Sequence, residues 1–474
     1  MFQSELLGWA CVAVVGALCL AGCAAGTGAK LPGERAIYEG VKASHAAAPT
    51  AEDYRVYQAR IEQALRRELA FFYPRCLDMT HGGFIHALPA DWEKRAPDER
   101  NKNIVYQARM TWTAAEVVKR RPELREEYLK YAAHGLAFLK DKMWDAQDGG
   151  FFWVVDEQGN PASLTDKHVY GNAFGIYSAA TVFQATSDPD ALELALKAFR
   201  WMDEHAHDAK NGGYYEALNR AGDVIVSADK SQRPERPTDL ISNPYGFKSM
   251  DSHIHILEAL TVLAQISPEP LVKQRLDEVF LIVRDKMVVQ PGCLNVIFTP
   301  SWKATAMGDS FGHDIETAYL LWEADIVRHT NPSNKTRPVT RSLVDHALKV
   351  GWDDVYGGFY NDGFAFGKPH QRSKSWWTQA EGLNALMLMH ETYGKQDPRY
   401  WRAFLHQWAM IDSLLIDPKD GGWYEQVLGD KLDSASKLNP WKASYHSVRA
   451  MLNVSDALGK LAGENSVNGT EQIK

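Results

Sequence analysis

The sequence contains little cysteine, no excess of basic residues and no long apolar run. Of its 5 cysteines, Cys11, Cys19 and Cys23 lie near the N-terminus, so only Cys76 and Cys293 are left to form at most one disulfide. Lys and Arg total 52 against 60 Asp and Glu, a net charge of −8, which gives no support for nucleic-acid binding. No CxxC or HExxH spacing indicates a metal site, and we expect neither a metal nor a cofactor.

The apolar stretch from Leu6 to Gly22 is shorter than the roughly 20 residues that a membrane-spanning helix needs. It ends in Leu-Ala-Gly-Cys, which resembles a bacterial lipoprotein signal (residues 1–22) with Cys23 as the lipidated first residue of the mature chain. An uncleaved membrane anchor is the alternative. Either one predicts a location in the bacterial cell envelope, with a flexible linker at residues 23–50, a folded domain at 51–461 and a polar tail at 462–474.

A pair of glycines followed by an aromatic or aliphatic residue recurs six times, at spacings of 67, 63, 80, 65 and 64 residues. The copies are Gly82-Gly83-Phe84, Gly149-Gly150-Phe151, Gly212-Gly213-Tyr214, the degenerate Gly292-Cys293-Leu294, Gly357-Gly358-Phe359 and Gly421-Gly422-Trp423. So steady and long a period indicates one structural unit used repeatedly. About 65 residues hold two helices and a short β-hairpin.

Six such units predict an all-α fold, an (α/α)6 barrel of six helical hairpins with short β-hairpins at one end. An open solenoid is the alternative. The long interval contains a proline-rich loop between Val224 and Lys248, which we expect to shape the substrate pocket.

A polar cluster follows each glycine pair, mostly at similar offsets. The members of most clusters are three or four residues apart and so lie on one helix face. The clusters are Arg109 with Trp112, Tyr170 with Asn172, His255 with Glu258, His313 with Glu316, Trp377 with Glu381, and His446 with Arg449. Any one of these pairs alone is ordinary on a helix surface. Because they share one phase of the repeat, we expect them to converge on a single cavity.

Three histidines, several carboxylates, an arginine and tryptophans suit proton transfer on a sugar. Opposed glutamates drawn from Glu258, Glu316 and Glu381 would instead suit a glycoside hydrolase. A metal site at His255, His313 and Glu316, or a non-catalytic carbohydrate-binding lipoprotein, are further alternatives. The remaining histidines without a phase partner are interpreted as structural; they are His81, His86, His134, His168, His205 and His207.

In these segments the chain resembles the N-acylglucosamine 2-epimerase superfamily, and within it the cellobiose 2-epimerases. The matching segments are Gln107–Arg109, Lys167–Phe174, His253–Glu258, Ser310–Glu316, Trp376–Glu381 and Tyr445–Arg449. The resemblance implies an (α/α)6 barrel that interconverts C2 epimers, or an aldose and a ketose, without metal or redox cofactor. Asp251-Ser252 replaces the family's common Asn-Thr, a difference that bears on sugar specificity.

The resemblance also implies roles for the residues in these motifs. His313 and His446 would be the acid/base pair and His255 a third essential histidine, acting through a cis-enediolate on a reducing sugar. The residues that would bind the sugar or adjust the basicity of the histidines are Arg109, Tyr170, Asn172, Glu258, Glu316, Trp377, Glu381 and Arg449. The expected partners are the sugar and, through the lipid anchor alone, a membrane.

Overall fold

A computed structural model describes residues 48–227, 238–306, 308–329, 331–364 and 368–463. The expected signal, the lipidation site Cys23, nearly all of the linker and residues 464–474 of the tail lie outside the described residues. Within the described ranges, no helix combines the length and the apolar character that crossing a membrane requires.

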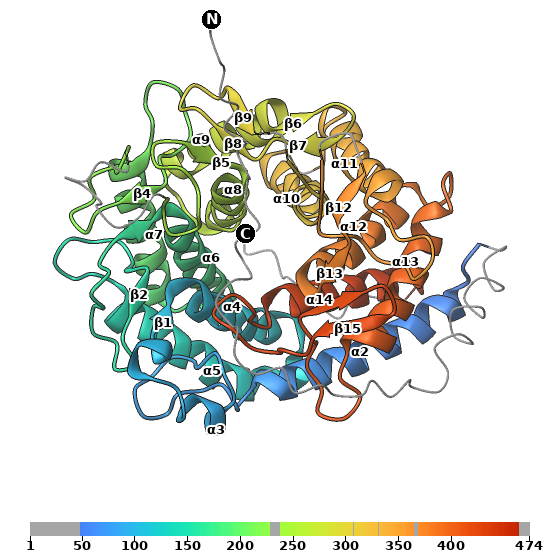
Figure 1. Cartoon of the computed structure of the whole chain (residues 1–474), viewed down its shortest axis with the longest axis horizontal. Coiled ribbons are helices and arrows are strands. Elements are labelled where there is room, and N and C mark those ends of the chain that lie inside the picture. Colours follow the sequence, from blue (N-terminus) through green and yellow to red (C-terminus); the bar gives the residue numbers. More distant parts are fainter. Residues whose placement is uncertain (1–47, 228–237, 307, 330, 365–367, 464–474) are drawn as a thin grey trace, which may run out of the picture.

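The chain forms two concentric rings of helices (Figure 1). The inner ring consists of α4(Ile104–Arg120), α6(Val169–Thr186), α8(Met250–Ile266), α10(Phe311–His329), α12(Trp376–Tyr393) and α14(Tyr445–Leu461). The outer ring consists of α2(Ala51–Phe72), α5(Arg125–Phe138), α7(Pro189–Ala206), α9(Pro270–Ile282), α11(Thr336–Val350) and α13(Arg399–Met410). The short helices and turns are α3(Pro89–Trp92), η1(Pro97–Arg100), η2(Pro122–Leu124), η3(Leu139–Met143), η4(Val283–Met287) and η5(Ile411–Leu415).

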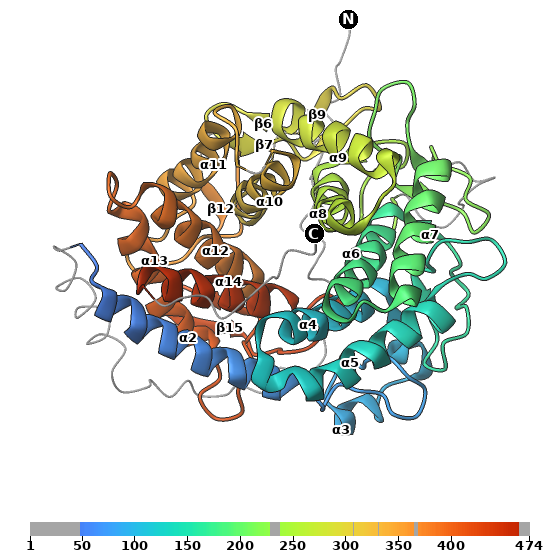
Figure 2. The same ribbon diagram turned by 180° about the vertical axis from the view of Figure 1, so that it is seen from behind.

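Contact between the first and last helices closes the ring. The last inner helix, α14, packs against the first inner helix, α4, and also against the N-terminal helix α2. Figure 2 shows α2 lying along α14 from behind, as Figure 1 does from the front. The N-terminal helix therefore supplies the outer partner of the last inner helix. The predicted (α/α)6 barrel is confirmed, and the open solenoid is wrong.

The two rings differ in how much of each helix is buried. In α4 every residue from Ile104 to Val118 is buried, because its neighbours in both rings cover it on all sides. The outer helix α7 instead buries one apolar stripe that includes Leu194, Phe199 and Met202. A buried inner helix needs its first N–H groups capped, and Asn103 does this for α4 by accepting a hydrogen bond from Tyr106 N at 2.8 Å.

Short strands connect neighbouring units at one end of the ring. The strands are β1(Lys102–Asn103), β2(Val154–Val155), β3(Lys167–His168), β4(Ala217–Leu218), β5(Lys248–Ser249), β6(Val288–Val289), β7(Cys293–Leu294), β8(Ile297–Phe298), β9(Ala304–Ala306), β10(Asp309–Ser310), β11(Asp362–Gly363), β12(Pro369–Gln371), β13(Ser373–Ser375), β14(Gln426–Leu428) and β15(Lys431–Ser434). The strand before an inner helix pairs, antiparallel, with a hairpin strand of the next unit, as β1 does with β2 and β3 does with β4. This pairing holds the start of each inner helix at the same end of the barrel.

The glycine pairs form the turns of the hairpins, and side chains near the start of the inner helices hold them in place. At Gly83, φ is +69° and a Cβ atom would lie 2.5 Å from Gln107 Oε1, so only glycine fits. The residue after each pair donates its backbone N–H to such a side chain or, in the last unit, to a glutamate of α2. The accepting residues are Gln107, Asn172, His253, Asp314, Gln379 and Glu68.

Lysines hold the same turns in five of the six units, and all of them are buried except Lys437, which is 15% exposed. Lys102 Nζ, for example, donates to Asp78 Oδ2 and to the carbonyl oxygen of Gly82, both at 2.7 Å. The equivalent pairs are Lys167–Asp145, Lys248–Asp208, Lys374–Asp353 and Lys437–Asp417. The fourth unit has no such pair among its described residues.

The proline-rich loop and the two cysteines lie in this hairpin layer or next to it. Residues 228–237 of the loop fall outside the described part, and the remainder is fixed by Asp239, whose carboxylate contacts His168 Nε2 at 3.0 Å. Its role in shaping the pocket stays a prediction. Cys76 and Cys293 are both buried, and no disulfide forms between them in the described chain.

Candidate functional site

Three histidines approach one another at the strand end of the inner ring. His255 lies on α8, His313 on α10 and His446 on α14, each within the first six residues of its helix. Trp377 of α12 lies between two of them, with ring centroids 4.7 Å from His313 and 5.8 Å from His446. The structure thus brings together imidazoles from units far apart in the sequence.

Arg449 links the carboxylates that surround these histidines. Its guanidinium donates to Glu258, to Glu316 and, at 2.7 Å, to Glu381, which lie on three different helices. The Tyr445 hydroxyl contacts both Glu258 and Arg449. Arg449 is 2% exposed, so these interactions are shielded from water. A single buried cation therefore holds three carboxylates in place at the centre of the barrel.

Two of the carboxylates also orient histidines. His446 Nδ1 lies 2.7 Å from Glu381 Oε1, and His255 Nδ1 lies 3.1 Å from Glu258 Oε2. Because an ionised carboxylate only accepts, each Nδ1 carries the proton and leaves Nε2 as the basic atom of a neutral ring. Among the described residues, His446 Nε2 has no hydrogen-bond partner. This tautomer is the one that a general base requires.

Burial sets the charge states of this network. Burial, followed by the nearby positive charge of Arg109, lowers the pKa of His446 well below its ordinary value, so the ring is neutral near pH 7. Burial alone would raise the pKa of Glu258, but Arg449 and the hydrogen bond from His255 outweigh it and lower the pKa to about 2. Burial raises the pKa of Glu381, although Arg449 opposes that effect.

His313 has different partners from the other two histidines. Its Nδ1 lies 2.8 Å from the Ser310 hydroxyl, and its Nε2 lies 3.2 Å from Asp251 Oδ1 on α8. The side chain of His313 is 22% exposed, whereas that of His446 is 5% exposed. A neighbouring carboxylate favours a proton on Nε2 of His313, so this ring is placed to donate a proton where His446 is placed to accept one.

Arg109 and Tyr170 form one wall beside His255. Arg109 donates to the Tyr170 hydroxyl at 3.2 Å and to the carbonyl oxygen of Trp441 at 2.8 Å. The Tyr170 ring packs edge-on against His255 with centroids 5.0 Å apart. The Arg109 guanidinium lies 4.6 Å from the ring centroid of Phe174. These contacts place a cation and a phenol next to the histidines.

The expectation that Asn172 binds substrate is corrected by the structure. Asn172 is fully buried, and its amide accepts from Phe151 N at 3.0 Å and donates to His168 O at 2.9 Å. Both polar groups are therefore used to hold the second hairpin. Asn172 occupies the position of Gln107 and His253, two residues before the position that reaches the cavity.

A shared helix position explains which residues reach the cavity. In each of the first five inner helices the sixth residue faces the centre, and in α14 Arg449 does so. The five sixth residues are Arg109, Phe174, His255, Glu316 and Glu381. Offsets counted from the glycine pairs do not reveal this shared position, because the loops between each glycine pair and the following inner helix differ in length. Counting from the N-cap of each inner helix would have separated Asn172 from the cavity residues.

The sequence assigned no role to two residues of the site, Tyr445 and Trp441, and it indicated Asp251 only as a departure from the family's Asn-Thr. Asp251 contacts His313, Tyr445 contacts Arg449, and Trp441 lies at the rim. Trp441 is 38% exposed, with its ring centroid 6.2 Å from that of Tyr170. The sequence signal that could have indicated it is its place four residues before α14, at the end of the helix where the mouth is expected.

The arrangement argues against both the hydrolase and the metal alternatives at this site. A hydrolase needs two carboxylates on opposite sides of the scissile bond, but Glu258, Glu316 and Glu381 are all bound to the same guanidinium. Glu316, Glu381 and His446 have ligand atoms within 4.8 Å of one another, yet the Arg449 guanidinium already binds both carboxylates. His255 and His313 bind separate partners.

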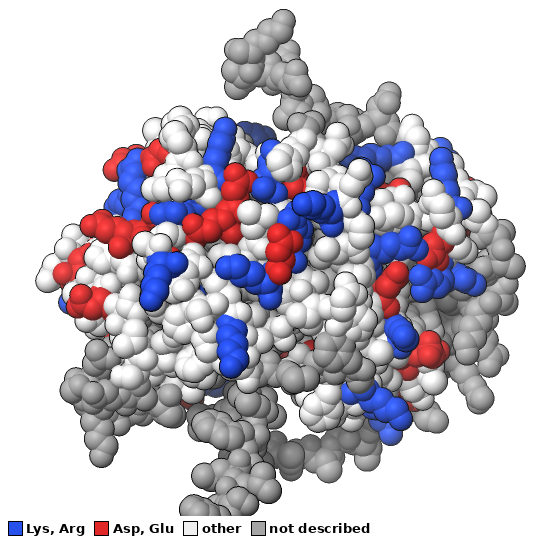
Figure 3. Space-filling view, turned by 90° about the horizontal axis from the view of Figure 1, so that it is seen from above, with Lys and Arg blue, Asp and Glu red and all other residues white. Residues whose placement is uncertain are grey.

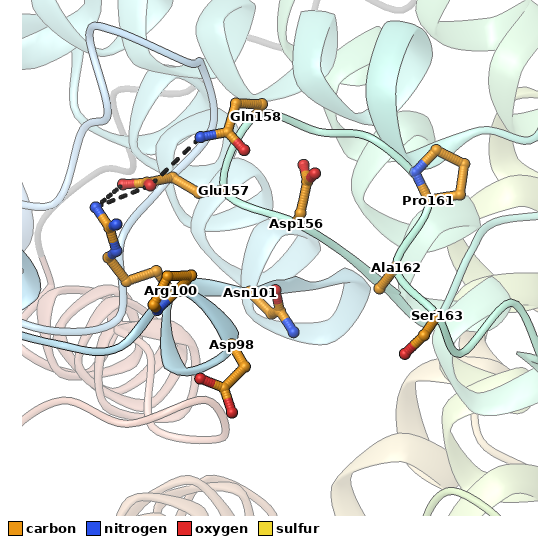
Figure 4. A pocket seen from close by; sticks show the side chains of 10 residues that line it. Asp98, Arg100, Asn101, Asp156, Glu157, Gln158, Pro161, Ala162 and Ser163 are labelled. Atoms are coloured by element: carbon orange, nitrogen blue, oxygen red, sulfur yellow. Dashed lines mark hydrogen bonds and ion pairs between the residues drawn. The ribbon is translucent and has the colours of Figure 1, made fainter.

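A second cavity lies apart from the histidines, in the hairpin layer. Its volume is about 520 Å³, and it lies between the turn at Asp98–Asn101 and the hairpin at Asp156–Ser163 (Figure 4). The ion pair between Arg100 and Glu157, 2.9 Å apart, crosses one side. No residue of the histidine site lines this cavity.

On the molecular face in Figure 3, described basic and acidic side chains are interspersed.

Comparisons with known proteins agree with this geometry. The family model for N-acylglucosamine 2-epimerase (GlcNAc 2-epimerase) matches residues 83–450. A cellobiose 2-epimerase from Bacteroides fragilis is 26% identical over 406 residues, covering 83% of this chain and 98% of that protein. A D-mannose isomerase from Marinomonas mediterranea is 24% identical over 417 residues, covering 84% and 97%.

Solved structures agree as well. The structure of cellobiose 2-epimerase from Spirochaeta thermophila DSM 6192 superposes with a TM-score of 0.72 at 30% identity, covering 86% of this chain and 98% of that one. The family match covers the first five inner helices in full and the start of α14, including His446 and Arg449. The chain therefore belongs to the N-acylglucosamine 2-epimerase family and is a carbohydrate epimerase or aldose–ketose isomerase that acts at carbon 2 of its sugar.

Proposed function

We propose that the enzyme epimerises the reducing-end sugar of a short oligosaccharide, cellobiose being the simplest candidate. The observation that carries this proposal is the convergence of three differently partnered histidines beneath an exposed indole at the rim. The cellobiose 2-epimerases among the relatives support the disaccharide. Isomerisation of free mannose is the second candidate, which the mannose isomerase relatives favour.

In the proposed mechanism the sugar opens to its aldehyde and a histidine removes the C2 proton. His446, neutral and held by Glu381 through Nδ1, is the base, and the electron pair of the C–H bond becomes the C1–C2 double bond of a cis-enediolate. Arg109 and the Tyr170 hydroxyl stabilise the oxygen that becomes negative. His313 returns a proton to the opposite face of C2, giving the epimer, while return to C1 would give the ketose.

The decisive experiment follows proton exchange at C2. The purified enzyme is incubated in heavy water with cellobiose, mannose, glucose or N-acetylmannosamine, and NMR reports loss of the C2 proton signal. The proposal predicts exchange and epimer formation with cellobiose at a higher kcat/KM than with any monosaccharide. Exchange confined to a monosaccharide would replace cellobiose as the substrate. A new reducing end without exchange would support a hydrolase and contradict the mechanism.

Trp441 is expected to decide how well a second sugar unit is bound. Its indole lies at the rim, 38% exposed, and its backbone holds Arg109, so only the ring is free to contact substrate. We expect Trp441→Ala to raise KM for cellobiose about tenfold and to leave KM for a monosaccharide nearly unchanged, since one stacking contact contributes roughly 1–1.5 kcal/mol. Steady-state kinetics on both sugars test this. Trp322→Ala, on the outward side of α10, is the matched control, and equal loss on both sugars would contradict the expected role.

Asp251 is expected to influence which sugar is accepted. Its carboxylate only accepts hydrogen bonds and lies 3.2 Å from His313 Nε2, where the family commonly has an amide that also donates. Asp251→Asn should change the ratio of kcat/KM between cellobiose and mannose by about tenfold, because sugar hydroxyls distinguish the two groups. The ratio is measured by competition kinetics, with Asp141→Asn on the surface as control. An unchanged ratio would show that Asp251 has no part in selectivity.

We also propose that the enzyme is lipid-anchored through Cys23 in the cell envelope. The motif Leu20-Ala21-Gly22-Cys23 and the small-residue segment after it support this proposal. Expression in a bacterial host with radiolabelled palmitate tests it: the wild-type chain should take up label and Cys23→Ser should not. Equal labelling of both, or of neither, would overturn it.

A further inference from the structure

The fourth unit of the barrel lacks the buried ion pair that holds the hairpin in the other five. In those units an aspartate four residues before the first glycine binds a lysine, and four of the lysines lie two residues before the inner helix. In the fourth unit the aspartate position is Val288 and the lysine position is Asp309. The second glycine is also replaced, by Cys293. At the lysine position, the fourth unit therefore has the negatively charged Asp309 where the other units have a positive charge.

A compact set of metal-binding side chains occupies the same location. The ligand atoms of Cys293 on β7, Asp309 on β10 and His346 on α11 all lie within 4.8 Å of one another. The three residues are 0%, 2% and 4% exposed, so water does not solvate them. His346 Nε2 is 2.9 Å from Asp309 Oδ2. Thiolate, imidazole and carboxylate are the donors that zinc takes in proteins.

A second buried carboxyl group faces this set. Asp314 Oδ1 accepts from Leu294 N at 2.9 Å, which fixes its side chain next to β7. Asp309 Oδ1 and Asp314 Oδ2 are buried, and within the described part of the chain no N–H or hydroxyl donates to either. A buried carboxylate oxygen that accepts no hydrogen bond is the kind of group that a bound cation satisfies.

We propose that the fourth unit binds one zinc-class divalent cation through Cys293, Asp309 and His346, where the other units place a lysine ammonium. One sulfur, one nitrogen and one oxygen ligand form a mixed set of the kind that zinc binds. The cation offsets the charges of Asp309 and the Cys293 thiolate, which are shielded from water. The ligands come from distant parts of the sequence, which is why no short spacing reveals them.

The position of this site gives it a structural task. Asp309 precedes Ser310, which contacts His313 Nδ1, and Asp314 directly follows His313. The cation joins the hairpin strand β7, the outer helix α11 and the strand β10, which leads directly into α10. It therefore holds the backbone that carries a histidine of the reaction site without contacting the sugar.

The test measures metal in the full chain, purified from zinc-supplemented cultures with a histidine-free tag. Elemental analysis should find about one zinc per chain in the wild type, and much less in Cys293→Ser and His346→Gln. Cys76→Ser, which alters an equally buried cysteine of the first hairpin, is the matched control and should keep its zinc. Removal of zinc by a chelator should lower Tm, and adding zinc alone should restore it.

Replacing zinc by Co²⁺ provides a readout that does not depend on the variants folding. A thiolate-to-cobalt charge-transfer band should appear in the wild-type chain, because Cys293 is a ligand. A wild-type chain that takes up neither zinc nor cobalt would overturn the proposal, and a proton shared by Asp309 and Asp314 would then account for the cluster. The proposal would also be overturned if Cys293→Ser and His346→Gln kept their full zinc content, or if the cobalt complex showed no charge-transfer band.

Discussion

Replacing His446 by Gln is expected to reduce C2 proton exchange by about 10²–10⁴-fold, the contribution of a positioned general base. The amide of Gln can still donate to Glu381, which His446 Nδ1 contacts at 2.7 Å, so the carboxylate network keeps a partner. The amide cannot accept the C2 proton, so only the chemical step is lost. Exchange rates in heavy water, measured by NMR, give the result directly.

The matched control is His205→Gln, the same substitution on the outer helix α7, where the imidazole packs against Trp201. It should leave exchange within about twofold of the wild type, since surface substitutions cost little. A His446→Gln variant that exchanged at a tenth of the wild-type rate or faster would remove this histidine from the proposed mechanism.

A second comparison separates one-base from two-base epimerisation. If His446 and His313 serve opposite faces of C2, each single variant stops epimer formation but still exchanges the proton of the epimer whose own base remains. If His446 acts alone, with a bond rotation in the enediolate, His446→Gln stops exchange from both epimers. The different partners of the two rings, Glu381 for His446 and Asp251 for His313, favour separate roles.

The barrel was predictable from the sequence because five of its six turns depend on a pair of glycines. In the first unit, positive φ at Gly82 and Gly83, and a Cβ that would meet Gln107, leave glycine as the only residue that fits. The pair therefore recurs in five of the six units and reveals the period. Closure of the ring was harder to predict from the sequence, because it depends on packing between α2 and α14, which lie far apart along the chain.

The site was only partly predictable, because a polar residue on an inner helix has two possible tasks. Asn172 and His255 look alike as polar residues of an apolar helix, yet Asn172 holds a hairpin and His255 faces the cavity. A shift of two residues rotates a helical side chain by about 200° around the axis and decides between the tasks. Loop insertions between the glycine pair and the helix hide this shift.

Contacts between units were harder still to foresee. Arg449 binds carboxylates from three other helices, and no local pattern shows that a single cation serves them all. Asp251 reaches His313 across the gap between α8 and α10. Pairings of this kind depend on the curvature of the ring, which the amino-acid pattern of one unit does not contain.

Replacing Arg449 by Met is expected to cost about 3–5 kcal/mol of unfolding free energy, the usual result of removing one partner of a buried ion pair. Met fills much of the same volume, so the loss is electrostatic: Glu258, Glu316 and Glu381 stay buried without their cation. Urea unfolding at pH 7 measures the change. Arg66→Met, which removes an arginine bound to Glu123 where both side chains are about half exposed, is the control and should cost about 1 kcal/mol or less.

The effect of pH distinguishes this electrostatic loss from simple loss of packing. In the wild type the Arg449 guanidinium helps to lower the pKa of Glu258 to about 2, below its value in the unfolded chain. The resulting contribution to folding stability is therefore present at pH 7, and it is lost only as the pH falls from about 4.5 toward 2. Without Arg449, burial raises the pKa of the carboxyl groups above their unfolded values, and the folded variant binds more protons than the unfolded chain. Lowering the pH from 7 to 5 should then stabilise Arg449→Met relative to the wild type and narrow the difference in Tm. A difference in Tm that stays constant between pH 7 and pH 5 would mean that Arg449 acts by packing, and that the three glutamates do not depend on its charge.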